Sequence, residues 1–346
     1  MTMNTLLLGD PSPSLRWRAA IELGDATDDD ADVGTWHAEI DRSPEVQALL
    51  AQLAEARVKP HRAGYMLCQL TYLGYQGPEL ASAVDAIFAL QQPDGSWPAR
   101  IEDPAQPAPK GTGGSPSRSP VAEGPRFVTM ETVVPLRGIA AAGFATDPRA
   151  ERAYEWLLDV RLPDGSWPAG PKADLGQGGR PSQPEPDYRR LTRGAGCRSA
   201  TTGAVACLAL HPERNRSDAA RTGVDHLLAR ETHDESSLGW EVSRLVGLER
   251  ALGRLTFYVT FDLAFLLDLA SRCGVSPEDR RVRDLVAYLE TMRGPYGLWQ
   301  HSAHPQLSGW LSFDLECSLG RLAEGDWIGN EEPANFTPYR RGPRRN

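Results

Sequence analysis

VDAIFALQQPDGSWP, residues 84–98, and YEWLLDVRLPDGSWP, residues 154–168, are the two stretches of sequence that decide the fold. Both contain the intact segment PDGSWP, which places Trp97 in the first copy and Trp167 in the second. In each copy, apolar residues at helical spacing precede a proline that ends the helix, an Asp-Gly turn and a tryptophan. The pattern predicts a repeated amphipathic helix that is closed by a turn, with the indole packed back on the helix.

Weaker copies of the same unit follow later in the chain. LVAYLETMRGPYGLW ends at Trp299, and VDHLLARETHDESSLGW ends at Trp240 with a longer turn. Each copy is preceded by another apolar segment beyond a Gly- or Pro-bearing turn, and strand signals are nearly absent. The expected partner helices, with two more near the N-terminus, are 15–23, 44–58, 63–75, 130–144, 200–210, 258–273 and 309–322.

This arrangement gives about 11 or 12 helices in six hairpins. Helix pairs of this length stack into an open solenoid or close into a ring, and six pairs favour closure. The predicted fold is therefore all-α, a single α/α toroid of the (α/α)6 kind. We expect one toroid domain over 1–330, with long loops at 98–126 and 168–196, and a disordered tail at 331–346.

Composition excludes several classes of function. The formal charge of −9, without a basic face to offset it, argues against nucleic acid as a partner. No apolar run approaches the ~20 residues of a transmembrane helix, although peripheral membrane contact stays open. The five cysteines are odd in number and form no CxxC pair, which fits a cytoplasmic protein without disulfides. The sequence does not decide the oligomeric state.

The motif QQPDGSW, Gln91 to Trp97, resembles the QW repeat of squalene-hopene cyclases and related terpene cyclases. The second copy has Arg161-Leu162 where the glutamine would stand. From DPSPSLRWRAA (10–20) to WLSFDLECSLGRL (310–322), the chain is similar to single-toroid bacterial proteins of the terpene cyclase and protein prenyltransferase superfamily. The motif is specific for a fold and says little about chemistry, because its residues tie helices together.

The resemblance implies a ring with an inner and an outer layer of helices around a binding cavity. It also implies a hydrophobic small-molecule substrate, isoprenoid or anionic, that is cyclised or isomerised by acid catalysis. Two alternatives stay open. One is a non-enzymatic toroid that binds a lipid, a peptide or a protein segment, and the other is zinc-dependent prenyl transfer.

A catalytic acid should lie near the start of an inner helix. The DxDD motif of class II terpene cyclases is absent. Asp262 and Asp314 each stand among apolar residues, where burial would raise the pKa of a carboxyl group, and Asp262 is the first candidate for the acid. Glu131 and Cys197 occupy similar positions and complete the set of candidate catalytic residues.

Candidate substrate-binding residues also cluster near the starts of the inner helices. Arginines there would accept an anion, and aromatic faces would stabilise a cation. Solvated loop arginines and ordinary core aromatics are the alternative interpretation. The set consists of Tyr65, Arg126, Arg193, Arg198, Arg254, Tyr258, Phe261, Trp310 and Phe313.

A zinc site has weaker support. Asp314 and Cys317 lie one helical turn apart, and His301 and His304 precede them. Zinc accepts these ligand types, but the Asp-x-x-Cys spacing departs from the Asp-x-Cys of the prenyltransferases that it resembles. We therefore expect no metal and no cofactor.

Overall fold

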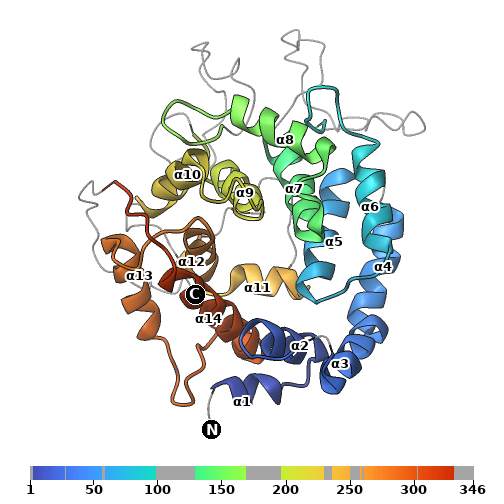
Figure 1. The fold of residues 1–346 in the computed structure, drawn as a ribbon, viewed down its shortest axis with the longest axis vertical. Helices are drawn as coiled ribbons and strands as arrows, with labels where there is room; N and C mark the ends of the chain where they lie inside the picture. Colours follow the sequence, from blue (N-terminus) through green and yellow to red (C-terminus); the bar gives the residue numbers. More distant parts are fainter. Residues whose placement is uncertain are drawn as a thin grey trace, which may run out of the picture.

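The computed structural model describes residues 3–27, 29–56, 59–98, 129–168, 196–229, 236–249, 258, 261–301 and 303–330. These residues form α-helices arranged as a closed ring with two layers (Figure 1). The inner layer consists of α2 (Pro13–Glu22), α5 (Pro60–Tyr72), α7 (Thr129–Ile139), α9 (Arg198–Ala209), α12 (Leu263–Arg272) and α14 (Ser308–Ala323). The outer layer consists of α1 (Met3–Leu8), α3 (Ala31–Arg42), α4 (Pro44–Ala56), α6 (Glu79–Phe88), α8 (Pro148–Asp159), α10 (Asp218–Leu228) and α13 (Arg280–Glu290).

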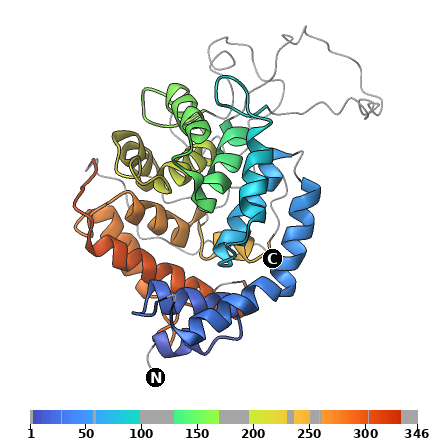
Figure 2. The same ribbon diagram turned by 45° about the vertical axis from the view of Figure 1, so that its right-hand side comes forward.

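Helices α2 and α14 close the ring. From α5 to α14 each inner helix packs against the next, and Arg18 of α2 donates to the carbonyl oxygen of Tyr72 in α5 at 3.3 Å. Helix α14 returns to α2, so that segments from both ends of the sequence lie side by side (Figures 1 and 2). Helix α1 contacts both α2 and α14 and covers this junction from outside. The predicted all-α toroid is confirmed, and no helix in the described part of the chain is long and apolar enough to span a membrane.

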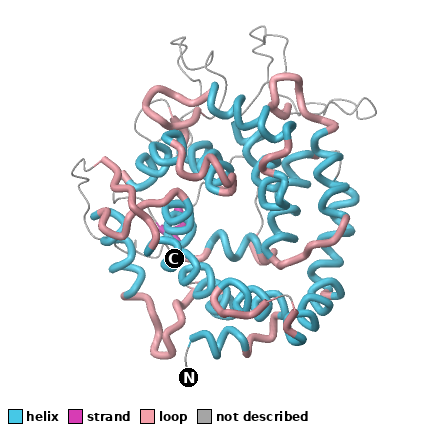
Figure 3. Tube along the Cα trace, in the orientation of Figure 1, coloured by secondary structure: helices cyan, strands magenta, loops and turns pink. Residues whose placement is uncertain are grey.

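Little structure of other kinds is present among the described residues, as Figure 3 shows. Strands β1 (Ser236–Ser237) and β2 (Phe261–Asp262) form a short parallel pair. A π-helical turn, Ala140–Phe144, extends α7, and a 3-10 turn, Pro305–Leu307, leads into α14.

The tryptophans of the repeat join the two layers in three equivalent turns. Each indole is buried, and its N–H donates to the carbonyl oxygen ten residues earlier, at 2.7 to 3.0 Å. The three pairs are Trp97 with Ile87, Trp167 with Leu157, and Trp299 with Leu289. The predicted positions of these three tryptophans are therefore confirmed.

The same tryptophans are also bound to the next inner helix. The backbone N–H of each donates to a hydroxyl group, and the acceptors are Thr132 (3.2 Å), Thr201 (3.0 Å) and Ser312 (2.8 Å). Each motif thus fixes the end of an outer helix to the inner helix that follows it.

The fourth copy of the repeat behaves differently. Trp240 does not close α10; it begins α11 (Trp240–Leu245), a short helix that lies inside the ring (Figure 1). Among the described residues, its indole N–H has no hydrogen-bond partner. The longer turn that precedes Trp240 therefore leads into an inserted helix instead of repeating the junction of the layers.

We expect Thr201→Val to lower the free energy of unfolding by about 1–3 kcal/mol, because it leaves the buried N–H of Trp167 without its acceptor. The exposed Thr35 makes a hydrogen bond within its own helix only, from its hydroxyl to the carbonyl of Ala31 at 2.8 Å. Thr35→Val is therefore the matched control, with an expected change within about 0.5 kcal/mol. Urea denaturation measures both, and equal effects of the two substitutions would contradict the role given to Thr201.

Candidate functional site

The interior of the ring contains a cavity of about 200 Å³. All six inner helices and α11 contribute to its wall. Besides Cys68 and Tyr72, seven side chains of the wall carry a carboxyl or guanidinium group. They are Arg18, Arg137, Glu241, Asp262, Asp268, Arg272 and Asp314.

The cavity coincides only in part with the place where the sequence predicted the binding mouth. Its wall includes the last turns of α5, α9 and α12, with Tyr72, Leu210 and Arg272, so it extends toward the C-terminal ends of these helices. The expected mouth was at the starts of the inner helices. Of the inner helices, only α12 contributes its start to the wall, with Asp262 and Ala264, and α11, which packs against α5, adds Glu241, Val242 and Leu245.

Helix α11 is held inside the ring by polar contacts with the inner helices. The side chains of Tyr65 and Gln69, both in α5, donate to the carbonyl oxygen of Arg244 at 2.8 and 2.9 Å. Arg137 of α7 forms an ion pair of 2.6 Å with Glu241. These contacts join residues that are more than a hundred positions apart in the sequence.

Asp262 lies between α11 and α12. One of its carboxylate oxygens accepts from the backbone N–H groups of Gly239 and Ala264, at 3.0 and 3.1 Å, and the other accepts from that of Glu241 at 2.6 Å. Burial raises the pKa of Asp262 to about 6, although these three donors lower it. Because both oxygens are bound by backbone groups, Asp262 caps α12 and anchors α11.

Asp314 lies on α14 and is partly exposed to the cavity. Its Oδ2 accepts a hydrogen bond of 2.9 Å from the hydroxyl of Tyr72, and no hydrogen bond from a described residue reaches Oδ1. Burial raises the pKa of Asp314 to about 7, against the opposing charge of Arg18. A carboxyl group of this kind exists in both protonation states near neutral pH and has one oxygen available to a ligand.

Arg18 fills the space beside Asp314. Its guanidinium carbon lies 4.7 Å from the ring centre of Tyr72 and 4.5 Å from that of Phe313, and its Nε forms an ion pair of 2.6 Å with Glu22. Trp310 stacks on Tyr72 at a centroid distance of 5.0 Å. The aromatic rings near Asp314 are therefore already in contact with a cation and with one another.

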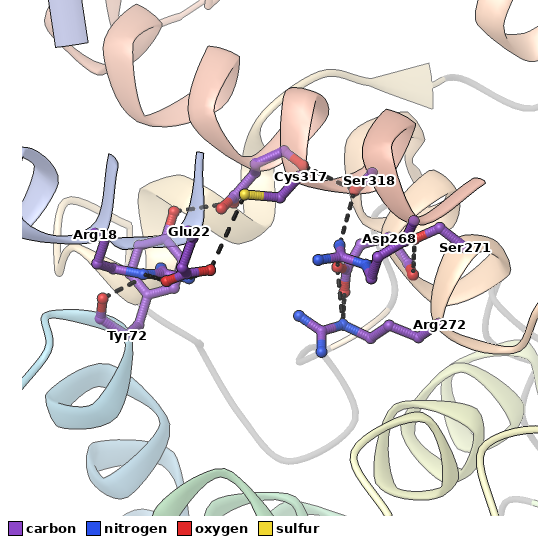
Figure 4. Close-up of polar contacts among 10 residues, drawn as sticks. Arg18, Glu22, Tyr72, Asp268, Ser271, Arg272, Cys317 and Ser318 are labelled. Atoms are coloured by element: carbon purple, nitrogen blue, oxygen red, sulfur yellow. Dashed lines mark hydrogen bonds and ion pairs between the residues drawn. The ribbon is translucent and has the colours of Figure 1, made fainter. Parts of the chain in front are cut away.

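A second charged cluster belongs to α12 and α14, and Figure 4 shows both clusters. Asp268 accepts from Nε of Arg272 at 2.9 and 3.0 Å and from Arg321 at 2.6 Å. Burial alone would raise the pKa of Asp268, but the charges of Arg272 and Arg321 outweigh it, and the pKa is lowered. Asp268 is therefore ionised at neutral pH.

The cavity does not include the other predicted catalytic residues. Glu131 is buried in α7, 3.9 Å from Nδ1 of His61. Cys197 is the buried N-cap residue of α9, and its N–H donates to the carbonyl of Trp167 at 2.7 Å. Of the four candidates, only Asp262 and Asp314 come together in the cavity wall.

None of the predicted binding residues that the structure describes belongs to the cavity wall. Tyr258 accepts from Arg137 at 3.0 Å and stacks on Phe265, so it lies behind the cavity wall. The guanidinium carbon of Arg198 lies 3.6 Å from the ring centre of Phe261, and both residues are buried. The predicted residues Arg126, Arg193 and Arg254 lie outside the described residues, as do most of 98–126, most of 168–196 and all of 331–346.

The four residues considered for zinc contact different parts of the fold. His301 bonds to Ser243 and to the carbonyl of Gly239, both at 2.8 Å, and His304 bonds to Glu249 at 3.1 Å. Asp314 and Cys317 instead contact α5 and α2. Within the described part of the chain, no group of three or more His, Cys, Asp or Glu side chains could hold a metal ion.

Sequence reasoning missed most of the ionisable wall. Arg18, Arg137, Glu241, Asp268 and Arg272 were not singled out. One signal was available in LAFLLDLASR, residues 263–272, where an Asp and an Arg four positions later interrupt an apolar helix. Charged residues in such a helix have to be paired or face a cavity.

Comparisons with known proteins add little to this geometry. No protein-family model matches the chain, and no curated protein matches it. Among solved structures, the chain is similar to a variant of the type II terpene cyclase MstE from Scytonema in complex with geranylgeranyl dihydroxybenzoate. The sequence identity is 15%, the TM-score is 0.39, and the match covers 83% of this chain and 79% of that chain.

Proposed function

We propose that the protein is an acid–base enzyme that isomerises a small unsaturated molecule in the cavity of the ring, with Asp314 as the proton donor. The observation that carries the proposal is the Asp314 carboxyl group, which faces the cavity, is bound by the described residues through one oxygen only, and has a pKa of about 7. General acids are most effective when their pKa lies near the working pH.

Tyr72 has a positioning role in this proposal. Because its hydroxyl donates to Oδ2 of Asp314, the exchangeable proton belongs on Oδ1, and the carboxyl group is held in one orientation. After the proton has been transferred, the same hydrogen bond stabilises the carboxylate. The carboxylate can then remove a proton from a second carbon of the substrate and so complete an isomerisation.

Proton transfer within a polar substrate fits the cavity better than a carbocation cyclisation. Arg18 lies over the rings of Tyr72 and Phe313, and Arg137 lies 4.8 Å from the ring centre of Phe265. These guanidinium groups occupy ring faces that would otherwise stabilise a carbocation, and their charge would repel one. The aromatic faces thus bind the arginines and are not available to a carbocation.

The volume also favours a small substrate. At about 200 Å³, the cavity is smaller than the roughly 300–1,000 Å³ that is typical of sites for drug-sized ligands. A long isoprenoid chain or a peptide segment would have to displace α11, which is anchored by buried polar contacts. For this reason we place the enzymatic interpretation before the non-enzymatic binding module and before prenyl transfer.

Solvent deuterium exchange tests the proposal before the natural substrate is known. The protein is incubated in D₂O with a set of small unsaturated acids, ketones and alcohols, and the carbon-bound hydrogens are followed by NMR. We expect deuterium to enter at least one compound at a rate proportional to protein concentration, and heat-denatured protein to be inactive. A compound that saturates the cavity without any exchange would instead support the binding module.

A further inference from the structure

We propose that Arg272 forms the binding site for the carboxylate group of a small organic acid, across the cavity from Asp314. The role of this acid as a substrate rests on the proposed function, whereas its binding does not. Arg272 lies in the last turn of α12, at a position that the sequence analysis had not identified, and its side chain is part of the cavity wall.

The geometry of the guanidinium group is the first support. Arg272 bonds to Asp268 through Nε alone, at 2.9 and 3.0 Å. Its two terminal nitrogens make no hydrogen bond with any described residue, and in Figure 4 they point away from Asp268 toward the side of the cavity with Arg18 and Tyr72. Two parallel N–H donors in one plane match the two oxygens of a carboxylate.

The balance of charge is the second support. Asp268 pairs with both Arg272 and Arg321, so this cluster has one positive charge in excess. Around the rest of the cavity, the described charges are matched when Asp314 is protonated: Arg18 pairs with Glu22, Arg137 and Arg244 pair with Glu241, and Asp262 supplies the second negative charge. The excess charge is therefore localised where the free donors of Arg272 point, and an anion would neutralise it.

The apolar part of the wall is the third support. The wall also includes Leu269 and Phe265 on α12, the helix of Arg272, and the small side chains Ala206 and Ala209 on α9, which contacts α12. A carboxylate bound at Arg272 would leave its hydrocarbon part against these side chains. Burial of this part would add to affinity.

A carboxylate bound at this position would also act on Asp314. Two negative charges in one cavity repel each other, so the bound acid favours the protonated form of Asp314, and binding takes up a proton. Affinity should therefore increase as the pH falls through 7. The charged and titratable groups that face Asp314 are Arg18 and Glu22 on α2, Tyr72 on α5, Asp268 and Arg272 on α12, and Cys317 on α14.

Isothermal titration calorimetry with benzoate tests the inference, with benzamide as a neutral molecule of the same shape. For the full-length protein at pH 6, we expect benzoate to bind at least about 10-fold more tightly than benzamide, because only benzoate carries a charge that Arg272 can pair with. At pH 8, we expect weaker benzoate binding. At pH 7, two buffers of different ionisation enthalpy should reveal the uptake of a fraction of a proton.

Variants assign the effect to Arg272. Arg272→Gln should weaken benzoate at least about 10-fold and leave benzamide unchanged. Arg272→Lys, which retains the charge and loses the pair of parallel donors, should have an intermediate effect and protects the test against a failure to fold. Arg280→Gln, at an outer position with 70% of its side chain exposed, is the charge-matched control.

Three results would overturn the inference: equal affinity for benzoate and benzamide, benzoate binding that is unchanged in Arg272→Gln, or a preference for inorganic phosphate over benzoate. The proposed function can fail separately. Benzoate binding at Arg272 without catalysed deuterium exchange would keep the anion site and reject the enzyme, whereas exchange of a neutral compound without benzoate binding would do the reverse.

Discussion

Asp314→Asn is expected to slow catalysed proton transfer by about 10²–10⁴-fold. Asparagine has the same shape and can still accept the hydrogen bond from Tyr72, but it has no ionisable proton. The fold should remain intact, because Asp314 is bound through one oxygen by a single described residue. The measurement is the initial rate of deuterium incorporation, with circular dichroism to confirm folding.

Glu316→Gln is the control for this experiment. Glu316 lies on the same helix and pairs with Arg293 on the outer side of the ring, at 2.7 Å, so its substitution should leave the rate within about twofold of the wild type. Tyr72→Phe should give a smaller loss than Asp314→Asn, because it removes only the group that positions the acid. Full activity in Asp314→Asn would remove this residue from the mechanism.

Gly239→Ala is expected to destabilise the protein by about 2–5 kcal/mol, since two costs add up. Gly239 has a φ of +87°, and a side chain in this conformation costs about 1–2 kcal/mol. Its Cβ would also lie 2.4 Å from Cδ2 of His301, a residue that is buried and hydrogen-bonded to Ser243. Relief of such a clash costs about 1–3 kcal/mol in a well-packed region.

A second glycine separates the two costs. Gly297 has a similar φ of +82°, and an added Cβ would meet no atom within 4 Å. Gly297→Ala should therefore show the conformational cost alone, about 1–2 kcal/mol. Urea denaturation gives both values, and hydrogen exchange at the amide of Glu241 reports whether α11 stays in place. Equal losses in the two variants would mean that the contact between Gly239 and His301 does not hold α11.

The outer junctions of the ring could be predicted because their signals are local. PDGSWP contains a proline beyond the end of the helix, the glycine of the turn and the indole that returns to the helix, all within six residues. These parts recur at Trp97 and Trp167, and their hydrogen bonds are the same. Trp240 shares the composition of the repeat but not its turn length, and for this reason it belongs to a helix inside the ring.

The cavity could be predicted only in part. Asp314 stood out because it is charged within an apolar segment, and Asp262 did so for the same reason. The two carboxyl groups differ in their hydrogen bonds because of α11. Backbone N–H groups at the start of α11 donate to Asp262 and not to Asp314. Contacts such as the pairing of Arg137 with Glu241 join positions about a hundred residues apart, and no periodicity in the sequence specifies them. The position of α11 inside the ring likewise depends on contacts between distant parts of the sequence.

The most direct test of the account is the titration of the Asp314 carboxyl group. Carboxyl-carbon NMR shifts of ¹³C-labelled protein, compared with those of Asp314→Asn, identify the signal of this residue and follow it with pH. We predict a midpoint near pH 7, because burial disfavours the charged form. A midpoint below about 4.5, as for a solvated aspartate, would show that Asp314 is ionised at neutral pH and would contradict its role as the proton donor.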